Sequence, residues 1–189
     1  MARSASKLTI ASTLCFCCFF LTGKLFAEGI KLTELDYKVS NKVLMAAAKA
    51  ELKFNSDVLA AVQSGIPLYF DLHIKVMQPR LYIWNKERHR VKYTFSFRKH
   101  ALSNQFVITN LVTGRRGVYR TIELAIDNLG EVDYLAVLDV KELSKTSVLF
   151  MEMLFELDIE SLPAPMIPMA YISRSWHISS SWLRKNLDL

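Results

Sequence analysis

Cysteine and glycine are scarce in this sequence, and their scarcity excludes several kinds of chemistry. The three cysteines, Cys15, Cys17 and Cys18, all lie within the first 27 residues. If that segment is removed, the remaining chain can form no disulfide, no thiolate zinc site and no cysteine nucleophile. The six glycines form neither a Walker motif nor a Gly-x-Gly-x-x-Gly motif, whose bare backbone amides would bind phosphate.

Motifs of metal-dependent and serine hydrolases are also missing. The four histidines show no His-x-x-x-His or His-Glu-x-x-His spacing, which would let zinc ligands converge. No Gly-x-Ser-x-Gly turn is present to expose a nucleophilic serine. We therefore expect no cofactor, no metal ion and no catalytic residues.

The N-terminal segment has the layout of an export signal. Arg3 and Lys7 precede an apolar run over residues 8–23, and Lys24 and a small residue, Ala27, follow it. This order predicts a signal peptide over residues 1–27 and a periplasmic mature protein. The alternative is an uncleaved inner-membrane anchor through residues 8–23, although that run is shorter than the roughly 20 residues a span needs.

The charge is modest once the N-terminal segment is set aside. The chain carries a net charge of +6, and Arg3, Lys7 and Lys24 supply three of these charges. Such an excess does not indicate a nucleic-acid partner. Two charged clusters alternate along expected strands, and we interpret both as solvated sheet faces rather than as a polyanion site or a glycosidase carboxylate pair. The basic cluster is Lys86, Arg88, Arg90, Lys92, Arg98 and Lys99, and the acidic one is Glu152, Glu156, Asp158 and Glu160.

Alternation of apolar and polar residues dominates the rest of the chain. It runs through residues 44–54, 66–76, 91–98 and 149–160. Successive side chains of a strand point to opposite faces, so each run predicts a half-buried strand. Alanines leave a helix as an alternative in the first run. One-sided burial is typical of antiparallel sheets, so we predict a mainly β, antiparallel β-sandwich-like domain over residues 28–189.

Two short helices are expected in the connections between strands. Ser56 is suited to cap the first, which Gly65 and Pro67 would end. Thr121 is suited to cap the second, with Gly130 as its stop.

Glycines and prolines predict the remaining connections. Residues 113–117 predict a hairpin turn between strands over 106–112 and 118–119. Three prolines in 162–168 predict an extended crossover without regular helix or inner strand. A final element is expected over residues 176–187.

An aromatic group beside an arginine is the most suggestive candidate site. Arg80, Tyr82 and Trp84 are the predicted binding residues, because aromatic side chains flanked by arginine can form a contact face. Tyr93, Phe95 and Phe97 belong to the same group, and the alternative is that the whole group lies in the core. The binding interpretation requires Tyr82 and Trp84 to point outward together.

The order of several landmarks resembles a known family. These landmarks are residues 65–68, residues 80–84, the expected helix over 121–130, and residues 157–165. Together they resemble a proteobacterial family of small secreted proteins known as domain of unknown function 4390. The chain departs from that pattern at Ile83 and Asn85, where a second tryptophan and an aspartate are expected. The resemblance implies an envelope location, association with a membrane sensor kinase, and no known activity.

The sequence therefore predicts a non-enzymatic binding module of the cell envelope, with a membrane or envelope protein as partner. A small-ligand or lipid-binding β-sandwich is the alternative, and it would need a closed apolar cavity between the sheets. An enzyme is a third hypothesis, which would require Arg80, His73 and an acid to converge in one cleft.

Overall fold

The computed structural model describes residues 29–142 and 148–188. The predicted leader, residues 1–27, lies outside them. The strands are β1 (Gly29–Ser40), β2 (Val43–Lys53), β3 (Leu68–Gln78), β4 (Lys86–His100), β5 (Gln105–Asn110), β6 (Arg116–Tyr119), β7 (Glu131–Asp139), β8 (Leu149–Leu157) and β9 (Leu183–Leu187). The helices are α2 (Ser56–Gln63), α3 (Ile122–Leu129) and α4 (Ile167–Ile172), with 3-10 turns η2 (Val140–Glu142) and η3 (Arg174–Trp176).

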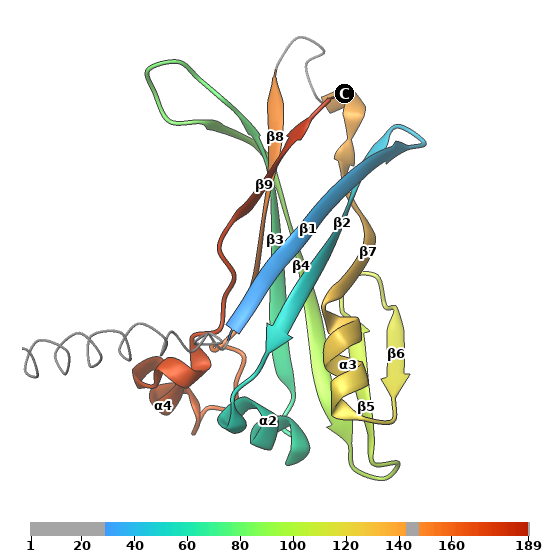
Figure 1. The fold of residues 1–189 in the computed structure, drawn as a ribbon, viewed down its shortest axis with the longest axis vertical. Coiled ribbons are helices and arrows are strands. Elements are labelled where there is room, and N and C mark those ends of the chain that lie inside the picture. The colour runs from blue at the N-terminus through green and yellow to red at the C-terminus, as the bar shows by residue number, and fades with distance from the viewer. Residues whose placement is uncertain (1–28, 143–147, 189) are drawn as a thin grey trace, which may run out of the picture.

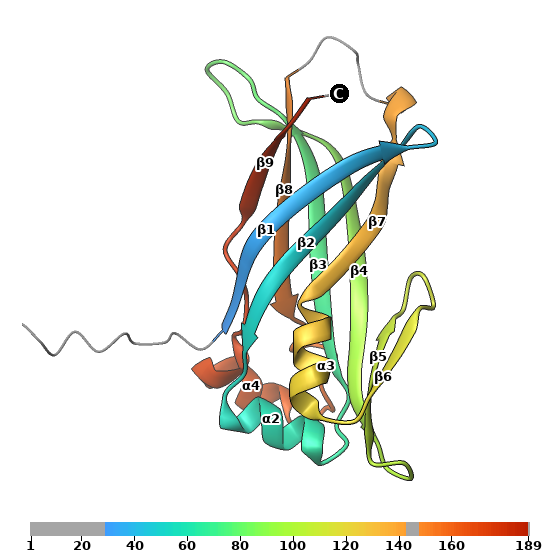
Figure 2. The same cartoon turned by 45° about the vertical axis from the view of Figure 1, so that its right-hand side comes forward.

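The strands form two antiparallel sheets that face each other (Figure 1; Figure 2). One has the order β1-β2-β7, and the other has the order β6-β5-β4-β3-β8-β9. Every strand pairing in both sheets is antiparallel. The predicted fold class, a mainly β antiparallel domain, is confirmed.

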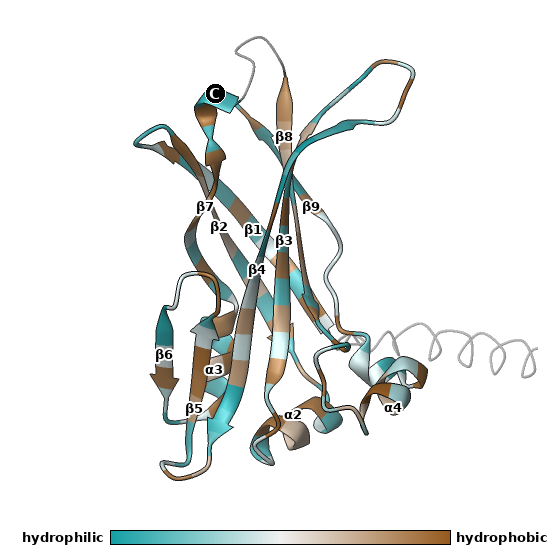
Figure 3. Ribbon diagram, turned by 180° about the vertical axis from the view of Figure 1, so that it is seen from behind, coloured by the Kyte–Doolittle hydropathy of each residue, from teal (hydrophilic) through white to brown (hydrophobic). Residues whose placement is uncertain are grey.

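The core lies between the two sheets. The apolar positions of β3 alternate with polar ones, which appear as bands along the strand in Figure 3. The apolar set of β3 (Leu68, Phe70, Leu72, Ile74 and Val76) is fully buried. From β8, Phe155 joins this core, and its ring centroid lies 6.0 Å from that of Phe70. Each such side chain contributes about 1.5–3 kcal/mol to folding by leaving water.

Two strands, β1 and β7, escaped the sequence analysis because bulges break their alternation. In β1 the register with β2 shifts between Leu32 and Glu34, so the buried positions change parity from Leu32 to Leu35. In the pairing of β2 with β7, the register shifts twice, between Leu44 and Met45 and again between Ala46 and Ala48. A bulge adds one residue to a strand and moves the following side chains to the opposite face.

The predicted second helix is confirmed, and the cap of the first needs correction. In α3, the Thr121 hydroxyl accepts a hydrogen bond from the Leu124 amide at 3.3 Å, and Gly130 follows the last turn. In α2 the cap is Asn55 rather than Ser56, because the side-chain oxygen Oδ1 of Asn55 accepts a hydrogen bond from the Val58 amide at 3.1 Å. Both residue types cap helices well, so their order alone did not decide between them.

A third helix, α4, corrects the prediction of two helices and of an extended segment over 162–168. This helix begins at Ile167 and carries Pro168 in its first turn. Proline is tolerated there because the first amides of a helix have no intrahelical partner. The expected final element is also shorter than predicted, since Trp176 ends η3 and only Leu183–Leu187 form β9.

The predicted hairpin over 106–119 is confirmed. Phe106 pairs with Tyr119, and Gly114 takes a positive φ of 73° in the turn. Strand β5 ends at Asn110, two residues earlier than expected.

The strands run along the long axis of the molecule, which therefore has two distinct ends. Strand β1 begins at one end, and the connection between β3 and β4 stands at the other (Figure 1).

Candidate functional site

A protruding loop joins β3 to β4, and we call its residues 79–85 the hairpin tip. It projects to the side, away from the upper end of β8 (Figure 1). Its four central residues are all apolar and all exposed: Leu81 (84%), Tyr82 (100%), Ile83 (59%) and Trp84 (93%). The tip therefore presents a continuous apolar surface to solvent.

The local sequence explains why the chain leaves the sheet here. The pairing of β3 with β4 ends at Gln78 opposite Lys86, and Pro79, which follows, has no amide to continue the ladder. Tyr82 then adopts a positive φ of 70°. Few non-glycine residues take this left-handed conformation, which turns the chain sharply back toward β4.

The basic residues next to the tip are solvent-exposed. Arg80, Lys86 and Arg88 are exposed, and none of them takes part in a salt bridge within the described residues. Glu87 is the acid between Lys86 and Arg88 in the sequence, and Arg90 donates two hydrogen bonds to its carboxylate at 2.9 and 2.6 Å. Those bonds hold the pKa of Glu87 below its ordinary value. The base of the tip is therefore positively charged.

The structure divides the aromatic group that the sequence singled out. Tyr82 and Trp84 both lie outside the core, as the binding interpretation requires. Tyr93 and Phe97 are buried and Phe95 is half-buried, so these three belong to the core.

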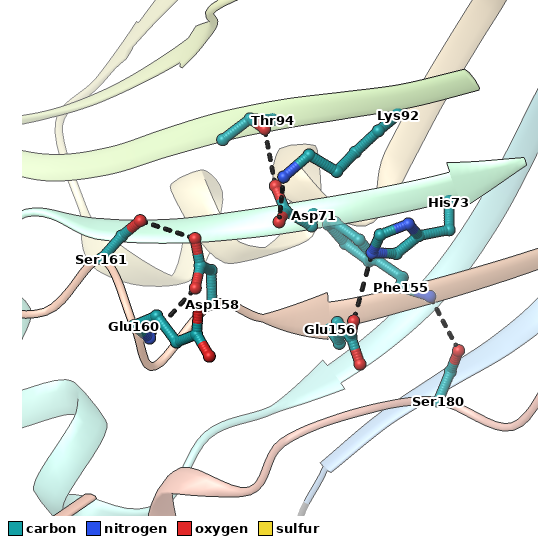
Figure 4. Close-up of polar contacts among 10 residues, drawn as sticks. All are labelled: Asp71, His73, Lys92, Thr94, Phe155, Glu156, Asp158, Glu160, Ser161 and Ser180. Atoms are coloured by element: carbon teal, nitrogen blue, oxygen red, sulfur yellow. Dashed lines mark hydrogen bonds and ion pairs between the residues drawn. The ribbon is translucent and has the colours of Figure 1, made fainter. Parts of the chain in front are cut away.

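A second candidate is a polar cluster on the outer face of β4, β3 and β8 (Figure 4). At its centre is Asp71, whose side chain is only 8% exposed. Its carboxylate accepts hydrogen bonds from Lys92 Nζ at 2.9 Å and from Thr94 Oγ1 at 2.6 Å. The bond to Asp71 raises the pKa of Lys92. These contacts satisfy a carboxylate that would otherwise be costly to bury.

Beside this ion pair, His73 and Glu156 contact each other across the β3–β8 pairing. His73 Nε2 lies 3.1 Å from Glu156 Oε1. Both line a surface cavity of about 390 Å³, whose far wall includes Trp176 and His177. The lining mixes polar and apolar side chains, and its ionisable groups have partners within the protein, so the cavity resembles a structural network more than a prepared catalytic site.

The convergence required of an enzyme is present only in part. His73 meets an acid, but Arg80 lies in the hairpin tip and does not line this cavity. Gln78, just before the tip, lies five residue steps along β3 from His73, which corresponds to roughly 16 Å. Across residues 29–142 and 148–188, no three His, Cys, Asp or Glu side chains are grouped as metal ligands.

The predicted acidic face needs a partial correction. Glu152 and Glu156 point outward from β8, where they pair with Arg184 and His73. Asp158 follows the end of β8, and its carboxylate accepts a hydrogen bond from the Glu160 amide in the next turn. The four acidic residues therefore lie on a strand and on the turn that follows it. The sequence analysis assigned all four to one strand because the alternation continues past the end of β8.

A cavity of about 270 Å³ between β5, β6, α3 and β7 bears on the lipid-binding alternative. Its lining includes Asn110, Arg115 and Asp133, so it is a polar cleft and not a closed apolar chamber. The space between the sheets is filled by fully buried side chains such as Phe70 and Phe97.

Comparison with protein-family models gives a match over nearly the whole chain. A family model matches residues 27–186, which include both the hairpin tip and the polar cluster. The chain belongs to the DUF4390 family. That name denotes a domain of unknown function, so membership supports the resemblance found in the sequence and assigns no activity. Searches of curated proteins and of solved structures gave no match to this DUF4390 protein. Within the described part of the chain, no helix is both long and apolar enough to cross a membrane.

Sequence reasoning missed part of each candidate site in this DUF4390 protein. Leu81 and Ile83 were not predicted as binding residues, although they complete an apolar run between Arg80 and Asn85. Asp71 and its partners Lys92 and Thr94 lie in different strands, and only the β3–β4 register brings them together.

Proposed function

We propose that this DUF4390 protein is a non-enzymatic binding module of the cell envelope and that the hairpin tip is its contact site. The observation that carries the proposal is the run of four exposed apolar residues from Leu81 to Trp84. A folded protein usually keeps such side chains covered, and a contiguous exposed apolar patch is typical of an interaction surface.

The energy of apolar burial supports a role of the tip in binding a partner rather than in stabilising the fold. Burial of one large apolar side chain contributes about 1.5–3 kcal/mol, and here that contribution remains unused. Tyr82 and Trp84 are also the residue types that dominate the energy of binding interfaces. The tip stands away from the core, so its side chains are free to meet another surface.

The compartment follows from the leader. Export through residues 1–27 would place the tip in the periplasm, where the surfaces that it meets are membranes and envelope proteins. The family resemblance adds a membrane sensor kinase as a protein partner to test.

Site-specific photo-crosslinking in living cells tests this proposal. Ile83 is replaced by p-benzoylphenylalanine in the full-length chain, and Leu102 is replaced in the same way as a matched control. Leu102 is more exposed than Ile83, at 94% against 59%, but lies in the turn between β4 and β5, at the other end of β4. We expect an adduct, with protein or with lipid, at position 83 and not at position 102.

Mass spectrometry of the purified bait completes the test. A chain that begins at Glu28 would support export with cleavage. Adducts of equal yield at both positions, or none at position 83 in correctly folded protein, would contradict the assignment of the tip as a contact site.

A further inference from the structure

We infer that the hairpin tip inserts into the interfacial region of a lipid bilayer that carries anionic headgroups. This inference rests on the proposed function, because it names the surface that the tip contacts.

The distribution of apolar surface around the tip favours a bilayer over a protein. Leu81, Tyr82, Ile83 and Trp84 follow one another directly, and all four are exposed. Neighbouring side chains along an extended or turning chain point in different directions, so one flat protein surface could cover only some of them. A bilayer surrounds an inserted tip on every side and covers them all.

The residue types suit the depth that such insertion would reach. Tyrosine and tryptophan are enriched at membrane interfaces, because each combines a large apolar ring with a polar group that stays near the headgroups. Leu81 and Ile83 have no polar group, and they alternate with these two aromatic residues. A short hairpin with this composition is an interfacial anchor and not a membrane span.

Charge gives the second, independent argument. Arg80, Lys86 and Arg88 are exposed beside the apolar residues, and Glu87, the acid between Lys86 and Arg88 in the sequence, is bound to Arg90. Their long side chains can reach back to the headgroup level while the tip is buried. A basic residue close to an anionic membrane surface strengthens binding by about fivefold at low salt.

Vesicle flotation with the full chain tests the inference. The probes are vesicles of phosphatidylcholine alone and of phosphatidylcholine with about one third phosphatidylglycerol. We expect binding to the mixed vesicles that weakens about tenfold in Trp84→Ser and in Tyr82→Ser. Leu102→Ser, with a similarly exposed side chain, should bind like the wild type.

A matched pair of charge variants separates the electrostatic part. Arg88→Gln should weaken binding to the mixed vesicles about fivefold, and added salt should weaken the wild type in the same way. Arg98→Gln removes an exposed arginine near the other end of β4 and should have no effect.

Fluorescence quenching reports on the tip itself, even if the leader also binds lipid. Vesicles of brominated phosphatidylcholine mixed with phosphatidylglycerol should quench the wild type more than Trp84→Phe, which keeps the two other tryptophans, Trp176 and Trp182. Thermal melting confirms that each variant is folded. Equal quenching in the two proteins, or equal flotation of wild type and Trp84→Ser, would overturn the inference.

The two proposals fail differently. If vesicle binding is independent of the tip but position 83 still crosslinks to a protein, the tip is a contact site and its partner is a protein. If neither depends on the tip, the proposed function fails as well.

Discussion

Tyr93 joins the two sheets through its side chain. It belongs to β4, and its hydroxyl donates a hydrogen bond of 2.6 Å to the carbonyl oxygen of Ala136 in β7. The residue is only 5% exposed, and burial raises the pKa of its phenol above the ordinary value of 10. Because the folded state favours the protonated phenol, its contribution to stability is present below about pH 10 and is lost as the pH rises through the higher folded pKa.

The first prediction concerns Tyr93→Phe. We expect a loss of about 1–2 kcal/mol in the free energy of unfolding at neutral pH, since the Ala136 carbonyl loses its donor. The variant should also lose less stability than the wild type above about pH 10. Urea denaturation at several pH values measures both effects. Tyr82→Phe, at a fully exposed position, is the control, and an equal alkaline loss in wild type and Tyr93→Phe would contradict the assignment.

Among single residues, the exposed aromatic pair was easier to find in the sequence than the polar cluster. Tyr82 and Trp84 were identified because their side-chain types are rare in solvent and common in interfaces. The contact between Asp71 and Lys92 depends on the register of β3 against β4. The connection between those strands is too long to be a standard two-residue turn, so turn chemistry could not fix that register.

Among the elements, α2 depends on one side chain for two contacts. Asn55 caps the helix by accepting from the Val58 amide, and its amide group donates to the carbonyl oxygen of Ser175 in η3 at 2.6 Å. The cap therefore also fastens the chain after α4 to the start of α2. In α3, Thr121 only caps, and it is exposed.

The second prediction compares these two caps. Asn55→Ala should lower the free energy of unfolding by about 2 kcal/mol, because it removes a cap and a second hydrogen bond. Thr121→Ala should cost about 1 kcal/mol. Asn55→Asp keeps the cap but turns a carboxylate oxygen toward the Ser175 carbonyl oxygen in a buried place, so we expect a loss at least as large as that of Asn55→Ala. Chemical denaturation of the three variants measures the order, and equal losses for Asn55→Ala and Thr121→Ala would show that the contact with Ser175 contributes nothing.

The elements also show where pattern reading works and where it stops. Strands β3 and β8 keep strict alternation and were predicted nearly to their ends. Strand β1 changes parity at its bulge, and a periodic pattern carries no mark of an inserted residue. Helix α4 was missed because its proline was interpreted as a helix breaker, although the first turn accommodates it.

For the molecule as a whole, the arrangement of strands sets a gradient of local stability. Strand β3 lies between β4 and β8 in the six-stranded sheet, and its inward side chains are fully buried. Strands β6 and β9 form the edges of that sheet and are short. Amides exchange slowly where opening them requires the core to separate, and quickly at exposed edges.

A third prediction follows from this gradient of local stability. In hydrogen–deuterium exchange measured by mass spectrometry, peptides from β3 and β8 should be protected longest, and those from β6 and the hairpin tip should exchange first. Addition of phosphatidylglycerol vesicles should slow exchange at the tip and leave β6 unchanged. Protection of β6 as strong as that of β3 would contradict the assignment of the edge strands.

The start of β1 and the hairpin tip lie toward opposite ends of the molecule, so a membrane that held the N-terminus would also set the orientation of the tip. The length of β3 alone corresponds to roughly 36 Å, whereas the few residues between Gly23 and Gly29 can extend about 20 Å at most. With its strands upright on an uncleaved anchor, the protein would point its tip away from that membrane, toward whatever lies across the gap. If export ended with removal of the leader, the same tip would be free to turn back to the bilayer that the protein had crossed. Cleavage of the leader would thus decide which way the molecule faces.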